Sequence, residues 1–150
     1  LRLDGNAGLT LAEAKLWINQ LSNERRLEWL EQPLSTDDLD GHYELSKKVP
    51  IALDQSLHVN PSLRSSWRGW QIRHPSLDGD PRSLLTELSK GMSHRVICTA
   101  FETGIGARWV HHLSALQRLG PTPTAPGLAP GWCPNGPLFS SDPTSVWDAA

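Results

Sequence analysis

The stretch LEWLEQPLS, residues 27–35, is a short apolar run that ends at an acidic residue and stops at Pro33. Proline has no N–H for a sheet ladder, so the chain is expected to leave the strand there. The run holds two carboxylates, Glu28 and Glu31, three positions apart. Because successive strand residues point to opposite faces, this odd spacing predicts opposite sides for the two, with Glu28 toward helices or solvent. Glu31 is then an acid at the tip of a buried strand.

The neighbouring segments repeat one unit of apolar strand, turn and amphipathic helix. TLAEAKLWINQL places Thr10 and Glu13 in capping-box positions, and DPRSLLTELSKG opens with Asp80 as a cap and Pro81 in the first turn. The predicted strands lie within LRLD (1–4), LEWL (27–30), PIALDQS (50–56), GWQIRHPSL (69–77) and HRVICTAFETG (94–104), and the predicted helices lie near 10–21, 37–48, 60–67, 80–91 and 105–119. Units of this kind predict a parallel sheet covered by helices.

Two parallel architectures compete for this pattern. A doubly wound sheet is expected to carry a glycine-rich phosphate loop after its first strand, and LRLDGNAGLT contains neither GxGxxG nor GxxxxGK[ST]. A (β/α) barrel places its chemistry at the carboxyl ends of several strands, where this chain repeatedly carries polar or acidic residues. The sequence therefore predicts an α/β fold, a partial (β/α) TIM-type barrel over residues 1–120. A complete barrel has eight units in about 250 residues, so five units in 150 residues are expected to be only part of one.

Residues 121–150 differ from the rest in being dense in proline and glycine and in lacking any periodicity. Such a composition predicts a loop or extended C-terminal segment. Because a disordered tail rarely keeps many aromatic side chains, Trp132, Phe139 and Trp147 are expected to pack this segment against the barrel.

The overall composition is that of a soluble globular domain, with 150 residues, 38% hydrophobic and 20% charged, and a formal net charge of −2. Basic residues are scattered, so neither nucleic acid nor a membrane surface is indicated as a partner, and a small-molecule substrate is expected. No apolar run approaches the roughly 18 residues that span a bilayer, and a cytoplasmic location is expected. Cys98 and Cys133 lack disulfide or zinc-site spacing, which predicts reduced thiols.

Three carboxylates end consecutive predicted strands: RLD ends in Asp4, WLE in Glu31 and ALD in Asp54. The carboxyl ends of parallel barrel strands meet at one rim, so these side chains are expected to converge. Like charges this close repel unless a cation neutralises them, and oxygen ligands without His or Cys favour Mg²⁺. Each acid alone is equally explained as a helix cap or a solvated loop residue. Three in succession, each after an apolar strand, favour a magnesium site.

The ordered motifs LRLDGN, LEWLEQPL, IALDQSL, PSLDGD and CTAFETGIG resemble the barrel domain of the enolase superfamily, muconate-lactonizing subgroup, and are most similar to its o-succinylbenzoate synthase branch. The resemblance covers roughly residues 1–120. It implies that the three acids, which match the ends of the third, fourth and fifth barrel strands, bind Mg²⁺. It also implies that TAFETGIG helps to hold a carboxylate substrate, with Thr99 and Gly104 at the matching positions.

The reaction that this resemblance implies is Mg²⁺-assisted removal of a proton α to a carboxylate, followed by dehydration. It converts 2-succinyl-6-hydroxy-2,4-cyclohexadiene-1-carboxylate to o-succinylbenzoate in menaquinone or phylloquinone biosynthesis. An α-proton of a carboxylate is weakly acidic, and nearby positive charge makes its removal feasible at neutral pH. The alternatives are another superfamily activity, a cycloisomerase or an N-acylamino-acid or dipeptide racemase, and a truncated barrel without catalysis that at most binds metal.

The resemblance begins at the family's third barrel strand, so it implies that the N-terminal strands and the capping domain are absent from this chain. The chain also departs from the family pattern in two places. The family's catalytic KxK lysines lie on the second barrel strand, before the part that this chain matches, so the chain alone is expected to be inactive. On the sixth strand the family has K-P-[ST]-L, whereas this chain has RHPSL, with His74 at the lysine position and Arg73 before it. Three interpretations follow: His74 is a substitute electrostatic or acid–base group, Arg73 supplies the charge although alternation points it away, or the position has lost its role.

Overall fold

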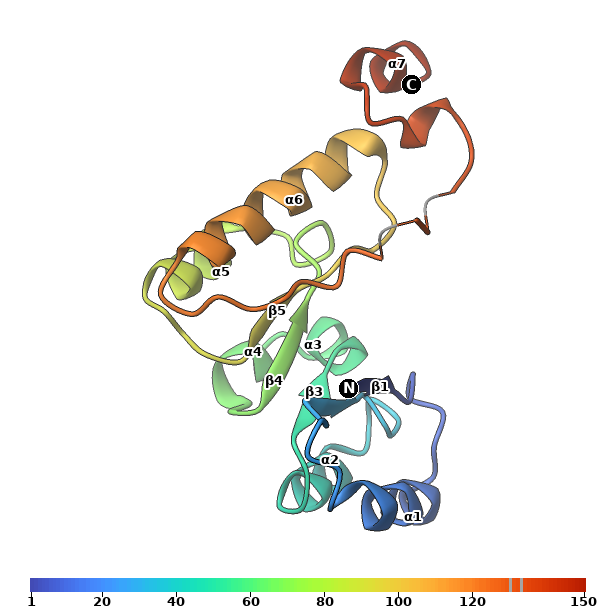
Figure 1. Ribbon diagram of the computed structural model, residues 1–150, viewed down its shortest axis with the longest axis vertical. Coiled ribbons are helices and arrows are strands. Elements are labelled where there is room, and N and C mark those ends of the chain that lie inside the picture. Colours follow the sequence, from blue (N-terminus) through green and yellow to red (C-terminus); the bar gives the residue numbers. More distant parts are fainter. Residues whose placement is uncertain (130, 133) are drawn as a thin grey trace. The chain divides into compact units, whose positions relative to one another are not determined.

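The computed structural model describes residues 1–129, 131–132 and 134–150, so the predicted thiol Cys133 lies outside the described residues. The chain divides into two compact units, Leu1–Ile72 and Arg73–Ala150 (Figure 1). Within the described ranges, no helix has both the length and the apolar character needed to cross a membrane.

Five short strands follow one another in chain order through the sheet, β1-β2-β3-β4-β5, and each is followed by a helix. The strands are β1 (Arg2–Asp4), β2 (Trp29–Glu31), β3 (Ile51–Leu53), β4 (Trp70–Arg73) and β5 (Arg95–Ile97). β1 pairs in parallel with β2, β2 with β3, and β3 with β4. Parallel neighbours joined through helices are the β/α pattern, and the predicted α/β class is confirmed.

The first unit buries its apolar residues between the strands and the helices α1 (Leu11–Leu21), α2 (Leu39–Ser46), α3 (Gln55–Val59) and α4 (Leu63–Ser66). The predicted capping box of α1 is confirmed, because the Glu13 N–H donates to Thr10 Oγ1 at 3.3 Å and the Thr10 N–H donates to Glu13 Oε2 at 2.8 Å. The helix then turns Ala14 and Ile18 inward. The rest of this core consists of Leu30, Leu34, Leu45, Val49, Ile51, Leu53, Leu57, Leu63 and Trp67.

The chain after β3 differs from the sequence prediction. The Asn60–Pro61 pair predicts a helix start, but α3 already follows β3 directly and α4 begins only at Leu63. The Asn60 side chain instead accepts hydrogen bonds from Ser62 N–H at 3.3 Å and Ser62 Oγ at 2.6 Å. Asn before Pro is a turn signal as well as a cap signal, and this local side-chain bond selects the turn.

The second unit builds its core between β5 and the helices α5 (Arg82–Ser89) and α6 (Gly104–Leu119), followed by the 3₁₀ helix η1 (Pro137–Phe139) and α7 (Pro143–Asp148). As predicted, α5 turns Leu84 and Leu88 into the core, with Leu85 partly buried against it. Gly91 follows the helix with φ +69, a conformation that favours glycine and ends the helix.

The C-terminal segment is more ordered than its composition predicts. Gly127 forms a parallel bridge with Cys98 after β5, and Asp142 caps α7 by accepting from the N–H of Thr144 and Ser145. The expected packing of Trp147 is wrong, because this side chain is 77% exposed while its neighbour Val146 is 2% exposed. Adjacent residues of a short helix point in different directions, and in α7 the buried position is occupied by Val146.

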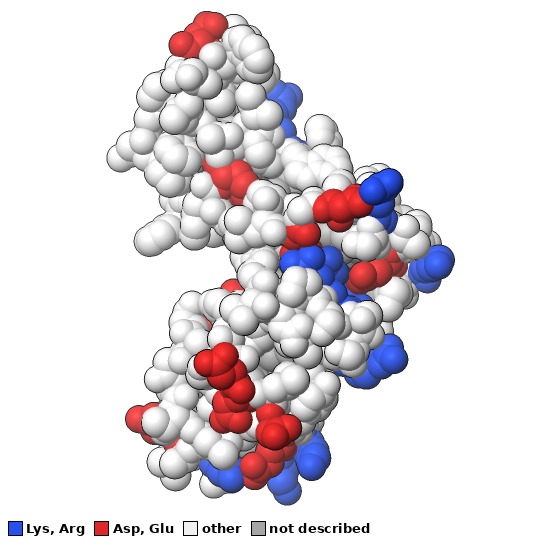
Figure 2. Space-filling model, turned by 180° about the vertical axis from the view of Figure 1, so that it is seen from behind, with Lys and Arg blue, Asp and Glu red and all other residues white. Residues whose placement is uncertain are grey.

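Charged side chains of both signs are interspersed on the face shown in Figure 2. The exposed ion pairs of the protein include Lys15 with Glu44 at 2.8 Å and Arg82 with Asp80 at 2.5 Å. Such pairs are screened by solvent and contribute little to stability.

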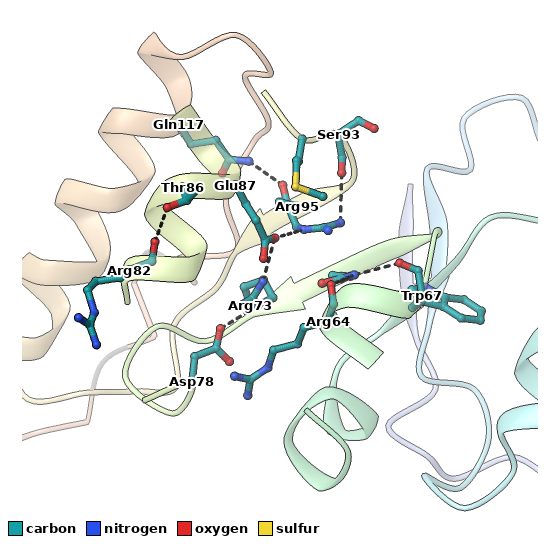
Figure 3. Close-up of polar contacts among 12 residues, drawn as sticks. Arg64, Trp67, Arg73, Asp78, Arg82, Thr86, Glu87, Ser93, Arg95 and Gln117 are labelled. Atoms are coloured by element: carbon teal, nitrogen blue, oxygen red, sulfur yellow. Dashed lines mark hydrogen bonds and ion pairs between the residues drawn. The ribbon is translucent and has the colours of Figure 1, made fainter. Parts of the chain in front are cut away.

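A buried ionic network ties the end of β4 to α5 and β5 (Figure 3). The Arg73 guanidinium donates to Asp78 Oδ2 at 2.7 Å and to Glu87 Oε2 at 3.2 Å, and Arg95 donates to the same Glu87 oxygen at 2.5 Å. The side chains of Arg73 and Asp78 are 1% and 2% exposed. Two cations facing two carboxylates leave no net charge in the interior, so the network is stable only as a complete set.

Replacing Arg73 by Met is expected to destabilise the fold strongly, because Asp78 would remain buried without its cation. The free energy of unfolding should fall by about 3–5 kcal/mol, measured by urea denaturation. The matched control is Arg82→Met, which breaks an exposed pair on α5 and should leave the urea midpoint unchanged. Equal midpoints for the two variants would contradict a structural role of the network.

Candidate functional site

The three predicted metal ligands all belong to the first unit and stand at the carboxyl ends of neighbouring parallel strands. Asp4 and Glu31 are Cα partners in the β1–β2 ladder, and Glu31 is the partner of Ala52 in the β2–β3 ladder. Asp54 follows Ala52 by two positions, the interval at which an extended chain returns to the same face. The strand register therefore brings the three acids to one end of the sheet.

The pKa of Asp4 depends mainly on its burial and, to a smaller extent, on the neighbouring Asp54. Partial burial raises the pKa of Asp4 and the negative charge of Asp54 raises it further, while the N–H of Asn6, which donates to Asp4 Oδ1 at 2.8 Å, acts in the opposite direction. The pKa of Asp4 remains above its ordinary value. A cation bound between the acids would remove the repulsion and favour the ionised form.

Glu31 and Asp54 also have protein partners. Trp29 Nε1 donates to Glu31 Oε2 at 3.0 Å, and His58, one turn along α3, places Nε2 3.6 Å from Asp54 Oδ1. In the part of the chain that the structure describes, oxygens of Asp4, Glu31 and Asp54 do not all come within 4.8 Å of one another. An all-carboxylate donor set fits a hard divalent cation such as Mg²⁺, which would draw the oxygens together against their repulsion.

Glu28, the other acid of the opening stretch, has a different environment. Its Oε2 accepts from Arg2 Nε at 2.6 Å, and the Arg2 guanidinium carbon lies 4.1 Å from the centre of the Trp29 ring. The side chain of Glu28 is half exposed. The prediction that Glu28 and Glu31 have separate roles agrees with these contacts, since Glu28 forms a surface ion pair at the start of β2.

Sequence reasoning missed Gln32, the residue between Glu31 and Pro33. Gln32 is fully buried, and its amide bonds to groups that follow β2 and β3. The only local signal was a polar residue between the strand-end acid and the proline. Two of its partners, Asp54 and Ser56, lie 22 and 24 positions away in the sequence.

In the second unit, the predicted substrate-binding segment is organised around Glu102, which the sequence analysis did not single out. Glu102 accepts from Thr99 Oγ1 at 2.6 Å, from Ser76 Oγ at 2.6 Å and from the Ala100 N–H at 2.9 Å. Burial by itself would raise the pKa of Glu102, but these hydrogen bonds outweigh it and lower the pKa. An ionised Glu102 therefore fixes the hydroxyl of Thr99 and joins the loops that follow β4 and β5.

Gly104, the other predicted substrate-binding residue, is the first residue of α6 and is buried. A Cβ at this position would collide with the carbonyl oxygen of Ser140, so glycine permits the C-terminal segment to approach the helix. A pocket of about 410 Å³ beside it is lined mainly by Arg108, His111 and His112 of α6 and by residues 139–141. Packing therefore explains this glycine, and its role toward a substrate stays a prediction.

The structure excludes one of the three interpretations of the RHPSL motif, the one that assigns the charge to Arg73. Arg73 is buried in the ionic network with Asp78 and Glu87, so it does not replace the family's lysine as an exposed cation. His74 follows β4 and is partly buried, and its carbonyl oxygen accepts from the N–H of Leu77 and Asp78 at 2.8 and 2.9 Å. A catalytic role for His74 stays a prediction.

Comparisons with known proteins agree with this geometry. Residues 1–65 match the family described as "Enolase C-terminal domain-like". No match was found among curated proteins. Among solved structures, o-succinylbenzoate synthase from Thermosynechococcus elongatus BP-1, complexed with Mg in its active site, is 28% identical with a TM-score of 0.78, over 100% of this chain and 50% of that one.

Two further solved structures match over a smaller share of this chain and of their own chains. MenC from Desulfotalea psychrophila LSv54 is 26% identical with a TM-score of 0.70, over 90% of this chain and 40% of that one. Muconate cycloisomerase from Pseudomonas fluorescens shares the fold at 23% identity and a TM-score of 0.62, over 75% of this chain and 33% of that one.

These matches confirm the predicted fold: the chain has a partial (β/α) barrel like that of enolase-superfamily proteins, and it spans about half the length of the matched synthase. The more particular resemblance, to o-succinylbenzoate synthase and MenC, is confirmed as well.

His42, which contacts Gln32, provides a test of the buried polar groups in the first unit. Burial lowers the pKa of His42 below its ordinary value, although the contact with Asp38 acts in the opposite direction. The unfolded chain therefore binds this proton more readily than the folded chain. The stabilising effect of neutral His42 is complete above the unfolded pKa of about 6.5 and is lost as the pH falls below it.

We expect the urea midpoint of the protein to decrease between pH 7.5 and pH 6.0 and this decrease to be smaller in a His42→Gln variant, which has no proton to take up. The range stays above the region where most carboxylates titrate. An unchanged pH dependence in the variant would show that His42 is not the responsible group.

Proposed function

We propose that this chain is the metal-binding part of an o-succinylbenzoate synthase-like lyase. The proposed reaction removes the proton α to a carboxylate and the hydroxyl group of 2-succinyl-6-hydroxy-2,4-cyclohexadiene-1-carboxylate, and releases o-succinylbenzoate and water. The observation that carries the proposal is the placement of Asp4, Glu31 and Asp54 at the ends of β1, β2 and β3 in a fold that resembles a synthase complexed with Mg.

In this proposal Asp4, Glu31 and Asp54 hold Mg²⁺ through carboxylate oxygens. When bound, the ion supplies positive charge near the substrate carboxylate, which makes the α-proton more acidic. The Trp29 indole N–H orients the Glu31 carboxylate, and the backbone N–H of Asn6 orients that of Asp4. These contacts support the ligand positions before the ion binds, as outer-shell hydrogen bonds do in known metal sites.

The proposed substrate contacts come from the segment around Thr99 in the second unit. The Thr99 hydroxyl donates its hydrogen bond to Glu102, so the Thr99 oxygen can act toward a substrate only as an acceptor. This oxygen also accepts a hydrogen bond from the Phe101 N–H at 3.0 Å. The arrangement suits the positioning of a polar substrate group rather than proton transfer by Thr99. We assign proton transfer to lysines of a preceding strand, as in the family, and an electrostatic contribution to His74.

Another enolase-superfamily activity is the second candidate, because a cycloisomerase or a racemase would use the same three acids. His74 in place of a lysine disfavours racemisation, which needs a base on each side of the substrate. We propose a small carboxylate as the substrate and a cytoplasmic location, in line with the composition and the family resemblance.

The metal site can be tested on the chain itself by isothermal titration with Mg²⁺. Glu31→Gln and Asp54→Asn should each weaken Mg²⁺ binding by at least about tenfold, because each removes one charged ligand. Glu28→Gln is the matched control, since it removes an acid of the same stretch that is paired with Arg2, and it should bind Mg²⁺ like the wild type. Equal effects of Glu28→Gln and Glu31→Gln would contradict the assignment.

The activity requires a protein in which this chain is joined to the preceding barrel strands with their lysines. Such a protein should form o-succinylbenzoate from the cyclohexadiene substrate only when Mg²⁺ is present. Mg²⁺ binding without any turnover would favour a non-catalytic barrel, and racemisation of dipeptides without dehydration would favour the second candidate.

A further inference from the structure

Gln32 touches the ends of all three strands that carry the proposed metal ligands. Its carbonyl oxygen accepts from the N–H of Ala7, in the loop after Asp4, at 2.7 Å, and its own N–H donates to the Ala52 carbonyl oxygen of β3 at 2.9 Å. The residue adopts φ 30 although it is not glycine, a conformation that persists where surrounding contacts hold it in place. The backbone of Gln32 thus joins β1 and β3 across the end of β2.

The side chain of Gln32 extends this connection to the third acid. Its Oε1 accepts from the backbone N–H of Asp54 at 3.1 Å and of Ser56 at 3.2 Å. Asp54 is the N-terminal cap position of α3, yet its side chain makes no capping hydrogen bond. The Gln32 oxygen accepts from the Ser56 N–H, a bond that the side chain of the N-cap residue usually makes. The Asp54 carboxylate therefore does not cap α3, and it faces His58 Nε2 at 3.6 Å.

A second set of contacts fixes which way the Gln32 amide points. Its Nε2 donates to Ser56 Oγ at 2.8 Å and to the Leu34 carbonyl oxygen at 3.0 Å, and it lies 3.2 Å from His42 Nε2. His42 Nδ1 lies 2.8 Å from the Asp38 carbonyl oxygen, which can only accept, so Nδ1 carries the proton and Nε2 is an acceptor. The nitrogen of the amide therefore faces acceptors, and its oxygen faces Asp54.

We infer that Gln32 is a positioning residue for the proposed magnesium site: it sets the spacing of the three strand ends and caps α3 in place of Asp54. The inference rests on the proposed function, since it concerns the same metal site. Gln32 has no direct contact with the metal in this assignment. Its effect passes through the backbone of Asp54 and the loop after Asp4.

The matched control is Gln71, another fully buried glutamine of the first unit. Its Nε2 donates to the carbonyl oxygens of Arg64 and Trp67, both at 3.1 Å, and neither carbonyl belongs to a loop that carries a proposed ligand. Gln32→Met and Gln71→Met each remove a buried amide and keep a side chain of similar length. Gln71 Oε1 accepts no hydrogen bond from the described residues, so the comparison isolates what the Gln32 oxygen does for Asp54 and Ser56.

The test is Mg²⁺ titration of the full chain by calorimetry, together with amide hydrogen exchange without Mg²⁺. Gln32→Met should weaken Mg²⁺ affinity about 10- to 100-fold, whereas Gln71→Met should stay within about twofold of the wild type. The amides of Asp54 and Ser56 should exchange faster in Gln32→Met and at the wild-type rate in Gln71→Met. If Gln32→Met does not fold, Ser56→Ala, which removes one partner of the amide, should still weaken Mg²⁺ binding severalfold.

The outcomes separate the two proposals. If the wild-type chain binds no Mg²⁺, the proposed metal site fails, and the inference fails with it. If the wild type binds Mg²⁺ and Gln32→Met or Ser56→Ala binds it equally well, only the inference about Gln32 is overturned. Equal losses of affinity in Gln32→Met and Gln71→Met would likewise overturn it, because they would indicate general loosening of the fold.

Discussion

The parallel register of β1, β2 and β3 is the constraint on which the first unit depends. Each of these strands has only three residues, so the ladder itself supplies few hydrogen bonds. The pairing continues beyond the strands, where the loop after β1 donates to the end of β2: Gly5 N–H to Glu31 O, Ala7 N–H to Gln32 O and Leu9 N–H to Pro33 O, at 2.8, 2.7 and 3.0 Å. A shift by one residue would break these bonds and separate Asp4 from Glu31.

Each unit places a polar group in its interior and surrounds it with hydrogen-bond partners, but with different chemistry. The first uses the neutral amide of Gln32, which faces backbone groups, Ser56 and a neutral histidine. The second uses the guanidinium of Arg73, which faces two carboxylates. A neutral network costs less to bury than charges and holds backbone geometry, which suits loops that carry ligands. The charged network instead joins β4 and β5 to α5. Loss of any one member would leave a buried charge without its partner.

Sequence patterns predicted those features that depend on near neighbours. The capping box of Thr10 and Glu13 and the two core leucines of α5 follow from spacings of three or four residues, and both are present. The order of acids after short apolar runs likewise predicted three strand ends, because alternation and chain breaks are local properties. The same patterns predicted the wrong start for the helix near Asn60, because Asn before Pro is typical of both a helix cap and a turn. They also predicted that Trp147 of α7 is packed, whereas Val146 is the buried residue.

The sequence by itself determined the α/β class, the five strands and the candidate ligands Asp4, Glu31 and Asp54. Tertiary structure decided what surrounds them: that Gln32 joins the three strand ends, that Arg73 is buried with Asp78 and Glu87, and that Gly104 lies against Ser140. The physical reason is distance along the chain. Hydrogen bonds within a helix or a turn link residues a few positions apart, whereas Gln32 meets Ser56 across 24 positions, and only the packed sheet brings the two together.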